Sequence, residues 1–76
     1  MKEFRQNISV PIRWTFLRDG QTMQSSMVGR YQAEIYKSHL TVMFYDSHGV
    51  LEHRFCGSRA KGMKLANKII SRLLLS

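Results

Sequence analysis

Four basic side chains recur every three or four residues near the end of the chain: Lys61, Lys64, Lys68 and Arg72. At 100° per residue they share one narrow arc of an α-helix, and the apolar residues of the same segment share the opposite arc. No acidic residue lies between His53 and Ser76 to pair with them. A phosphate backbone would relieve the repulsion between these like charges and release counterions. The four residues, here called the basic stripe, therefore predict a phosphate contact; the other interpretation is a solvated lysine-rich face.

The start of this helix is a second candidate site for an anion. Ser58 is the predicted N-cap, and Arg59 and Lys61 follow it. Free backbone N–H groups and the positive end of the helix dipole favour a phosphate there. Gly62, in the first turn, costs about 1 kcal/mol of helix propensity relative to Ala. Its missing side chain fits either packing against a sheet or a close phosphate.

Arginines on predicted strands are a third candidate. If the aromatic residues of the strands point toward the helix, Arg13, Arg30 and Arg54 point away from it. A sheet or ribbon can enter the DNA major groove, where arginine suits guanine edges. The competing interpretation is that Arg13 and Arg54 pair with Glu34 and Glu52 across strands.

This orientation also assigns other side chains to the two faces of the sheet. The aromatic residues expected to point inward are Trp14, Phe16, Phe44 and Phe55. The residues expected to point outward with the arginines are Gln32, Tyr36, Thr41, Met43 and Tyr45. Exposed Met and Tyr residues indicate a protein interface or a self-association surface.

The residues that catalysis or metal binding would need are sparse. His39, His48 and His53 are spread over two turns and a strand, and Cys56 is the one cysteine. No HxH or CxxC spacing is present, so no zinc site is predicted. A histidine could act as an acid or base in a small basic ribonuclease, but no nucleophile or carboxylate cluster accompanies it. We therefore expect no enzymatic activity and no cofactor.

The elements that position these residues follow from hydrophobic periodicity. Residues 8–16 alternate apolar and polar side chains, which predicts a strand. Pro11 favours an edge position or a bulge for it, and Asp19-Gly20 favours a hairpin turn after it. A second strand is predicted at 27–36, with an earlier start left open and with Gly29 marking a bulge or a close backbone approach.

Two more strands and one helix complete the prediction. The strands are expected at 39–45 and 50–56, separated by a turn at 46–49. In the last strand, Leu51 and Phe55 share one face and Glu52 and Arg54 the other. The fold class is therefore α+β: an antiparallel meander of three to four strands followed by one C-terminal helix over one face. Residues 1–76 form a single small domain, with 1–7 as a loose lead-in.

Composition sets the class of partner. The 76 residues include 12 Lys and Arg against five Asp and Glu, for a net charge of +7. Nucleic acid is the first partner to consider for so basic a small domain, and an acidic protein surface is the alternative. A hydrophobic fraction of 43% argues against intrinsic disorder. The single cysteine, the absence of a secretory signal and the short apolar runs favour a cytoplasmic protein without a membrane span.

Two families show a topological similarity to roughly the last 48 residues. The strand order ending in KGMKLANKI resembles the last part of double-stranded-RNA-binding domains, in which a basic helix start meets the nucleic-acid backbone. The string GRYQAEI resembles the three-stranded arm-binding domains of phage integrases. Neither family's motif is matched in full, so no residue role is transferred from them.

The first functional hypothesis is a non-enzymatic nucleic-acid-binding module, with DNA favoured over RNA. The stripe would grip phosphates, and the sheet arginines would contribute base contacts. The alternative is a small inhibitor or adaptor protein, of the kind made by phages and mobile elements, that docks on a larger host protein or nucleoprotein complex. A homodimer is compatible with either hypothesis.

Overall fold

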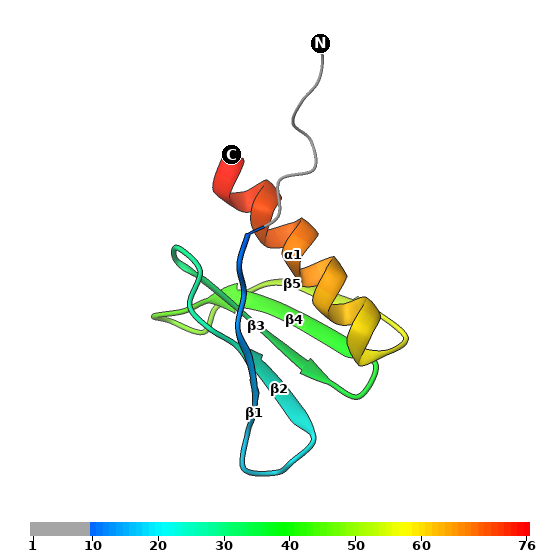
Figure 1. Ribbon diagram of the computed structural model, residues 1–76. Helices are drawn as coiled ribbons and strands as arrows, with labels where there is room; N and C mark the ends of the chain where they lie inside the picture. Colours follow the sequence, from blue (N-terminus) through cyan, green and yellow to red (C-terminus); the bar gives the residue numbers. More distant parts are fainter. Residues whose placement is uncertain (1–9) are drawn as a thin grey trace.

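The computed structural model describes residues 10–76, which form one antiparallel sheet and one helix (Figure 1). The strands follow one another in a meander, each hydrogen-bonded to the next along the chain. Their bounds are β1 Trp14–Phe16, β2 Thr22–Ser25, β3 Tyr31–Tyr36, β4 His39–Phe44 and β5 Val50–Phe55. Helix α1 spans Arg59–Leu75 and crosses one face of the sheet, over β3 and β4. The predicted α+β meander with a C-terminal helix is therefore confirmed, with five strands rather than three or four.

The additional strand comes from a turn inside the predicted strand at 27–36. Val28 and Tyr31 exchange two backbone hydrogen bonds, of 2.9 and 3.0 Å, around Gly29 and Arg30. Gly29 has φ +61, and a glycine at the first central position is typical of a tight hairpin turn. A Cβ built on Gly29 would also lie 2.8 Å from Leu74 Cδ2, so the predicted close approach occurs here as well. The chain reverses at this point, and β2 and β3 are separate strands.

The first predicted strand is shorter in the structure than its pattern suggested. Only Trp14–Phe16 pairs with β2, although Val10 and Ile12 still pack against the core. Ile8 and the predicted lead-in at 1–7 lie outside the described residues. As Pro11 suggested, β1 is at one edge of the sheet. The predicted turn at Asp19-Gly20 connects it to β2, and Gly20 has φ +69.

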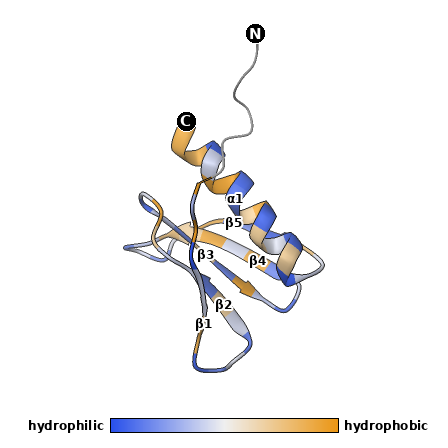
Figure 2. Cartoon of the chain, in the orientation of Figure 1, coloured by the Kyte–Doolittle hydropathy of each residue, from blue (hydrophilic) through white to orange (hydrophobic). Residues whose placement is uncertain are grey.

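The core lies between α1 and the sheet. Ser58 is the N-cap, as predicted: its backbone is extended and its hydroxyl accepts from the N–H of Lys61 at 3.2 Å. This cap fixes where the helix begins, and the apolar spacing then turns one side of α1 toward β3 and β4. In Figure 2, hydrophilic and hydrophobic residues alternate along α1, as expected for a two-sided helix. The core cluster consists of Met23, Ala33, Ile35, Leu40, Val42, Ala66, Ile69 and Ile70.

A β-bulge interrupts the pairing of β4 with β5. Val42 lies opposite Glu52, but Met43 lies opposite Val50, so Leu51 is an extra residue with no cross-strand partner. A one-residue shift of register moves each later side chain of a strand to the other face of the sheet.

The bulge exchanges the two predicted faces of β5. Arg54 lies opposite the fully buried Leu40 and is therefore on the face toward α1. Phe55 lies opposite His39 on the other face, where it is 73% exposed. The expectation that Phe55 points inward and Arg54 outward is wrong, because the apolar alternation does not reveal the register shift.

Candidate functional site

All four side chains of the basic stripe are exposed, on the side of α1 opposite the core: Lys61, Lys64, Lys68 and Arg72. Ala66 and Ile70, which face the sheet, are fully buried. Leu65, which the helical wheel places beside the stripe, is half-buried and packs against the core. The structure therefore brings the four predicted residues together on one accessible surface.

Among the described residues, no acidic side chain neutralises the positive charges of the stripe. Within 10–76, none of its cations forms an ion pair; the ion pair found in this part of the chain joins Arg54 to Glu52 at 3.2 Å. Glu34 accepts a hydrogen bond from Gln24, and Asp19 bonds within its own turn. Four positive charges on successive turns thus face solvent without a counter-charge on their own helix.

Arg59 has a different role from the stripe. Its guanidinium donates to the carbonyl oxygen of Gln21 at 3.1 Å and lies 5.2 Å from the centroid of the Phe16 ring. Both partners belong to the β1–β2 hairpin. Arg59 therefore connects the start of α1 to that hairpin.

The structure decides between the two interpretations of Gly62. A Cβ at this position would lie 2.9 Å from Ile35 Cδ1 and 3.0 Å from Cys56 Sγ. The first distance is shorter than Cβ contacts in real structures and the second is tighter than most of them, so Ile35 would have to shift to admit a side chain here. Gly62 permits close packing of α1 on the sheet, which is the first of the two interpretations.

The three sheet arginines do not form one surface. Arg30 is in the β2–β3 turn, with its guanidinium 5.4 Å from the centroid of the Phe44 ring. Arg54 pairs with Glu52 along its own strand, not across strands. Arg13 precedes β1 and is exposed, and Glu34 bonds to Gln24 instead of to it. The three arginines therefore do not form one shared face that could contact DNA bases.

The predicted Met and Tyr surface is also only partly exposed. Tyr36 and Tyr45 are 46% and 45% exposed. Met43 lies opposite Gln32, and both are buried, at 6% and 7% exposure. Gln32 donates its side-chain amide to the carbonyl oxygen of Ser25.

The outer face of the sheet, which is the face away from α1, instead carries a cluster of rings. His39 and Phe55 are cross-strand neighbours with ring centroids 5.7 Å apart, and His39 and His53 are diagonal neighbours at the same distance. Tyr36 lies opposite His39 on β3. We call these four residues the ring cluster: Tyr36, His39, His53 and Phe55.

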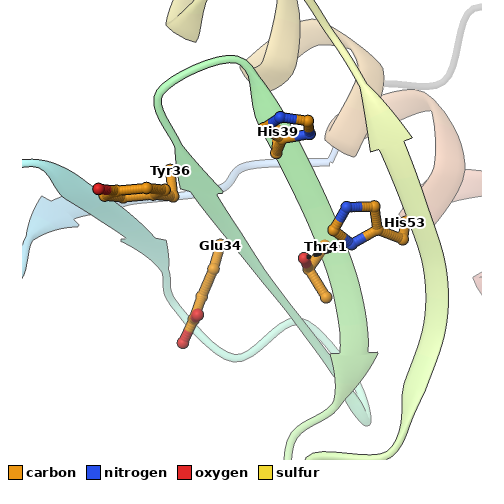
Figure 3. A pocket seen from close by; sticks show the side chains of 5 residues that line it. All are labelled: Glu34, Tyr36, His39, Thr41 and His53. Atoms are coloured by element: carbon orange, nitrogen blue, oxygen red, sulfur yellow. Dashed lines mark hydrogen bonds between the residues drawn. The ribbon is translucent and has the colours of Figure 1, made fainter.

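A shallow open hollow of about 290 Å³ lies within this face. It is lined by Glu34, Tyr36, His39, Thr41 and His53, which project from β3, β4 and β5 on the same side (Figure 3). Thr41 Oγ1 and His53 Nδ1 are 3.3 Å apart, within hydrogen-bonding distance. The sequence pattern treats the histidines separately, because only the shifted register of β5 places His53 opposite Thr41 and next to His39.

Residues 10–76 contain neither a metal-binding cluster nor a cysteine placed for chemistry. No group of three or more His, Cys, Asp or Glu side chains there could hold a metal ion. Cys56 is half-buried, and its thiol donates to the carbonyl oxygen of Ser38 at 3.2 Å. Its contact with Gly62 and the core shows that it packs as a small hydrophobic residue.

In the described part of the chain, no helix has the length and apolar character needed to cross a bilayer.

Comparison with protein-family models, with curated proteins and with solved structures finds no match.

Proposed function

We propose that this protein is a non-enzymatic nucleic-acid-binding module that grips phosphates with the basic stripe. The observation that carries the proposal is the exposure of Lys61, Lys64, Lys68 and Arg72 on one side of α1 without an ion pair among residues 10–76. Each close like-charge pair costs a few tenths of a kcal/mol on a helix. Binding to phosphates replaces this repulsion by attraction and releases counterions from the nucleic acid.

Duplex DNA is the favoured ligand. Helix α1 covers β3 and β4 on one side only, so its basic side is open to a large partner. The major groove of B-DNA admits an α-helix. The major groove of A-form RNA is so narrow that protein side chains cannot reach the base edges in it. Lysine binds phosphate as a point charge, which supports binding with little sequence preference.

The proposal is tested by titrating a 20-base-pair duplex at several salt concentrations. With three or four phosphate contacts, log Kobs should fall against log[salt] with a slope of about −3 to −4. The variant K61Q/K64Q/K68Q/R72Q should reduce this slope to near zero. The matched control R13Q/R18Q/R30Q/K37Q removes four exposed cations elsewhere and should keep most of it.

Two results would contradict the proposal. An unchanged slope in the stripe variant, with a reduced slope in the control, would move the contact to the sheet and loop arginines. Absence of duplex binding at low salt would leave the inhibitor or adaptor hypothesis ahead. That alternative is favoured by one observation: β5 is an edge strand, and Val50 and Phe55 on it are 62% and 73% exposed. Such an edge can accept a strand from a protein partner.

A further inference from the structure

The ring cluster has the geometry of a stacking platform. Its members come from three adjacent strands, and each is exposed: Tyr36, His39, His53 and Phe55. His39 lies between two ring neighbours, since its centroid is 5.7 Å from those of both His53 and Phe55. Exposed aromatic rings on a sheet are costly to hydrate and offer flat faces to a planar ligand. Unpaired nucleobases stack on such rings whatever their identity.

The hollow beside the rings adds hydrogen-bonding groups. Glu34 is half-buried there and receives one hydrogen bond, from Gln24 Nε2 at 3.2 Å. An ionised carboxylate accepts hydrogen bonds but does not donate them. It would therefore accept from the exocyclic amino groups of adenine, cytosine or guanine, which thymine and uracil lack. Thr41 and His53 provide further polar atoms along the same wall.

Charge favours a nucleic acid over an apolar protein segment as the occupant. The chain carries a net charge of +7, and Lys37 lies at the rim with its ammonium 5.4 Å from the centroid of the Tyr36 ring. A strand whose bases enter the hollow can place a phosphate near this cation. Because α1 covers the opposite face of the sheet, the ring cluster and the basic stripe are separate surfaces.

We infer that the outer face of the sheet is a second binding site, which takes unpaired nucleobases by stacking on Phe55, His39 and Tyr36 and prefers bases with an amino group through Glu34. This inference extends the proposed function, because it adds single-stranded nucleic acid to the duplex phosphate contacts of the stripe. The two surfaces are tested separately.

The first experiment compares a 12-mer of deoxyadenosine with an abasic 12-mer of equal phosphate number. The protein should bind the base-containing strand about tenfold more tightly, as expected for one or two stacked bases. Phe55→Ala should remove most of this ratio, and Phe55→Tyr should restore it because the ring is retained. Val50→Ala is the matched control: Val50 is an exposed apolar residue of the same strand outside the cluster, and the ratio should not change.

The second experiment tests the hydrogen-bonding wall. The 12-mer of deoxyadenosine should bind more tightly than the 12-mer of deoxythymidine, and Glu34→Gln should reduce this preference. The ring-dependent ratio between base-containing and abasic strands should remain in that variant. An unchanged preference would overturn the role of Glu34.

The outcomes distinguish the inference from the proposed function. Equal binding of base-containing and abasic strands, together with a stripe-dependent salt slope on the duplex, would overturn the inference alone. A base-dependent ratio that needs Phe55, together with no duplex binding, would overturn the stripe proposal alone. Binding of neither strand nor duplex would overturn both.

Discussion

The carboxamide of Asn67 pairs with both backbone polar groups of Val10. Its Nδ2 donates to the Val10 carbonyl oxygen at 2.6 Å, and its Oδ1 accepts from the Val10 N–H at 3.2 Å. The Ser71 hydroxyl donates to the same Oδ1 at 3.3 Å. A side-chain amide carries the same donor and acceptor as a peptide group, so Asn67 provides what a neighbouring strand would provide. In Figure 1 the segment before β1 accordingly begins beside α1.

Removal of this pair should loosen the segment before β1. We expect Asn67→Ala to lower the free energy of unfolding by about 1–3 kcal/mol, because both polar groups of Val10 lose a partner. Urea denaturation measures the change, and hydrogen exchange should show faster exchange of the Val10 amide. Lys68→Ala, at the neighbouring exposed position, is the control. If Asn67→Ala is as stable as this control, the pair does not hold the segment.

The close contact of Gly62 with Ile35 predicts a destabilised Gly62→Ala variant. Alanine gains about 1 kcal/mol of helix propensity, but overpacking of a core typically costs about 1–3 kcal/mol. We expect a net loss of about 1 kcal/mol. Ile35→Val removes Cδ1, the nearest atom to the new methyl group, so Gly62→Ala should be less costly in that background. Denaturation of the four proteins of this double-mutant cycle would show additivity if the contact were unimportant.

Arg59 should affect stability more than nucleic-acid binding. Replacement by glutamine removes the hydrogen bond to the Gln21 carbonyl and the contact with the Phe16 ring. We expect a loss of about 0.5–1.5 kcal/mol, since the site is exposed and such contacts are modest there. Lys64→Gln removes the same charge from the stripe and should leave the stability nearly unchanged while weakening duplex binding. These roles would be contradicted if Lys64→Gln lowered the stability and Arg59→Gln weakened duplex binding instead.

Ionised Asp19 should stabilise the folded protein, and this contribution should be lost at acidic pH. The Thr22 hydroxyl, followed by the backbone N–H groups of Thr22 and Gln21, holds the pKa of Asp19 below its ordinary value. A depressed pKa means that the ionised form stabilises the folded state. This contribution is fully present above the unfolded pKa and is lost as the pH falls through the folded pKa.

Asp19→Asn should therefore be less stable than the parent protein at neutral pH, and the difference should shrink as the pH falls below about 4. Urea midpoints measured from pH 7 to pH 2 give the comparison. Asp46→Asn removes a carboxylate from the exposed β4–β5 turn and serves as the control. A constant difference across the whole pH range would argue against a role for the Asp19 charge.

The sequence predicts the helix and its phase well because several independent signals agree there. Ser58 supplies the cap, the apolar spacing selects the buried side, and the cations occupy the remainder. The exposure of the basic stripe follows directly from this agreement. The extra strand was not predicted, because Gly29 fits a bulge or a turn equally well until its pairing partners are known.

The outer face was harder to predict, for a reason of geometry. Apolar alternation shows which residues of a strand share a face, but not which face is buried. Near its end, β5 carries one large side chain on each face: Phe55 on one, and Arg54, with its aliphatic stem, on the other. The sequence of this strand therefore does not show which face is buried. The helix contacts β3 and β4, and thus β5 is left partly uncovered on both sides.

The single unpaired residue Leu51 has a consequence for how this surface can change over evolutionary time. Loss of one codon at this position, with the β4–β5 turn kept, would restore an uninterrupted ladder without rotating the rest of the strand, because Val50 would stay opposite Met43 and Glu52 opposite Val42. His53 and Phe55 would therefore stay on the outer face, and Glu52 and Arg54 would stay on the face toward α1. The two faces would exchange only if Leu51 were kept and paired with Val42, because each later residue of β5 would then move by one position. A chain that is one residue shorter at this position thus keeps the same aromatic exterior.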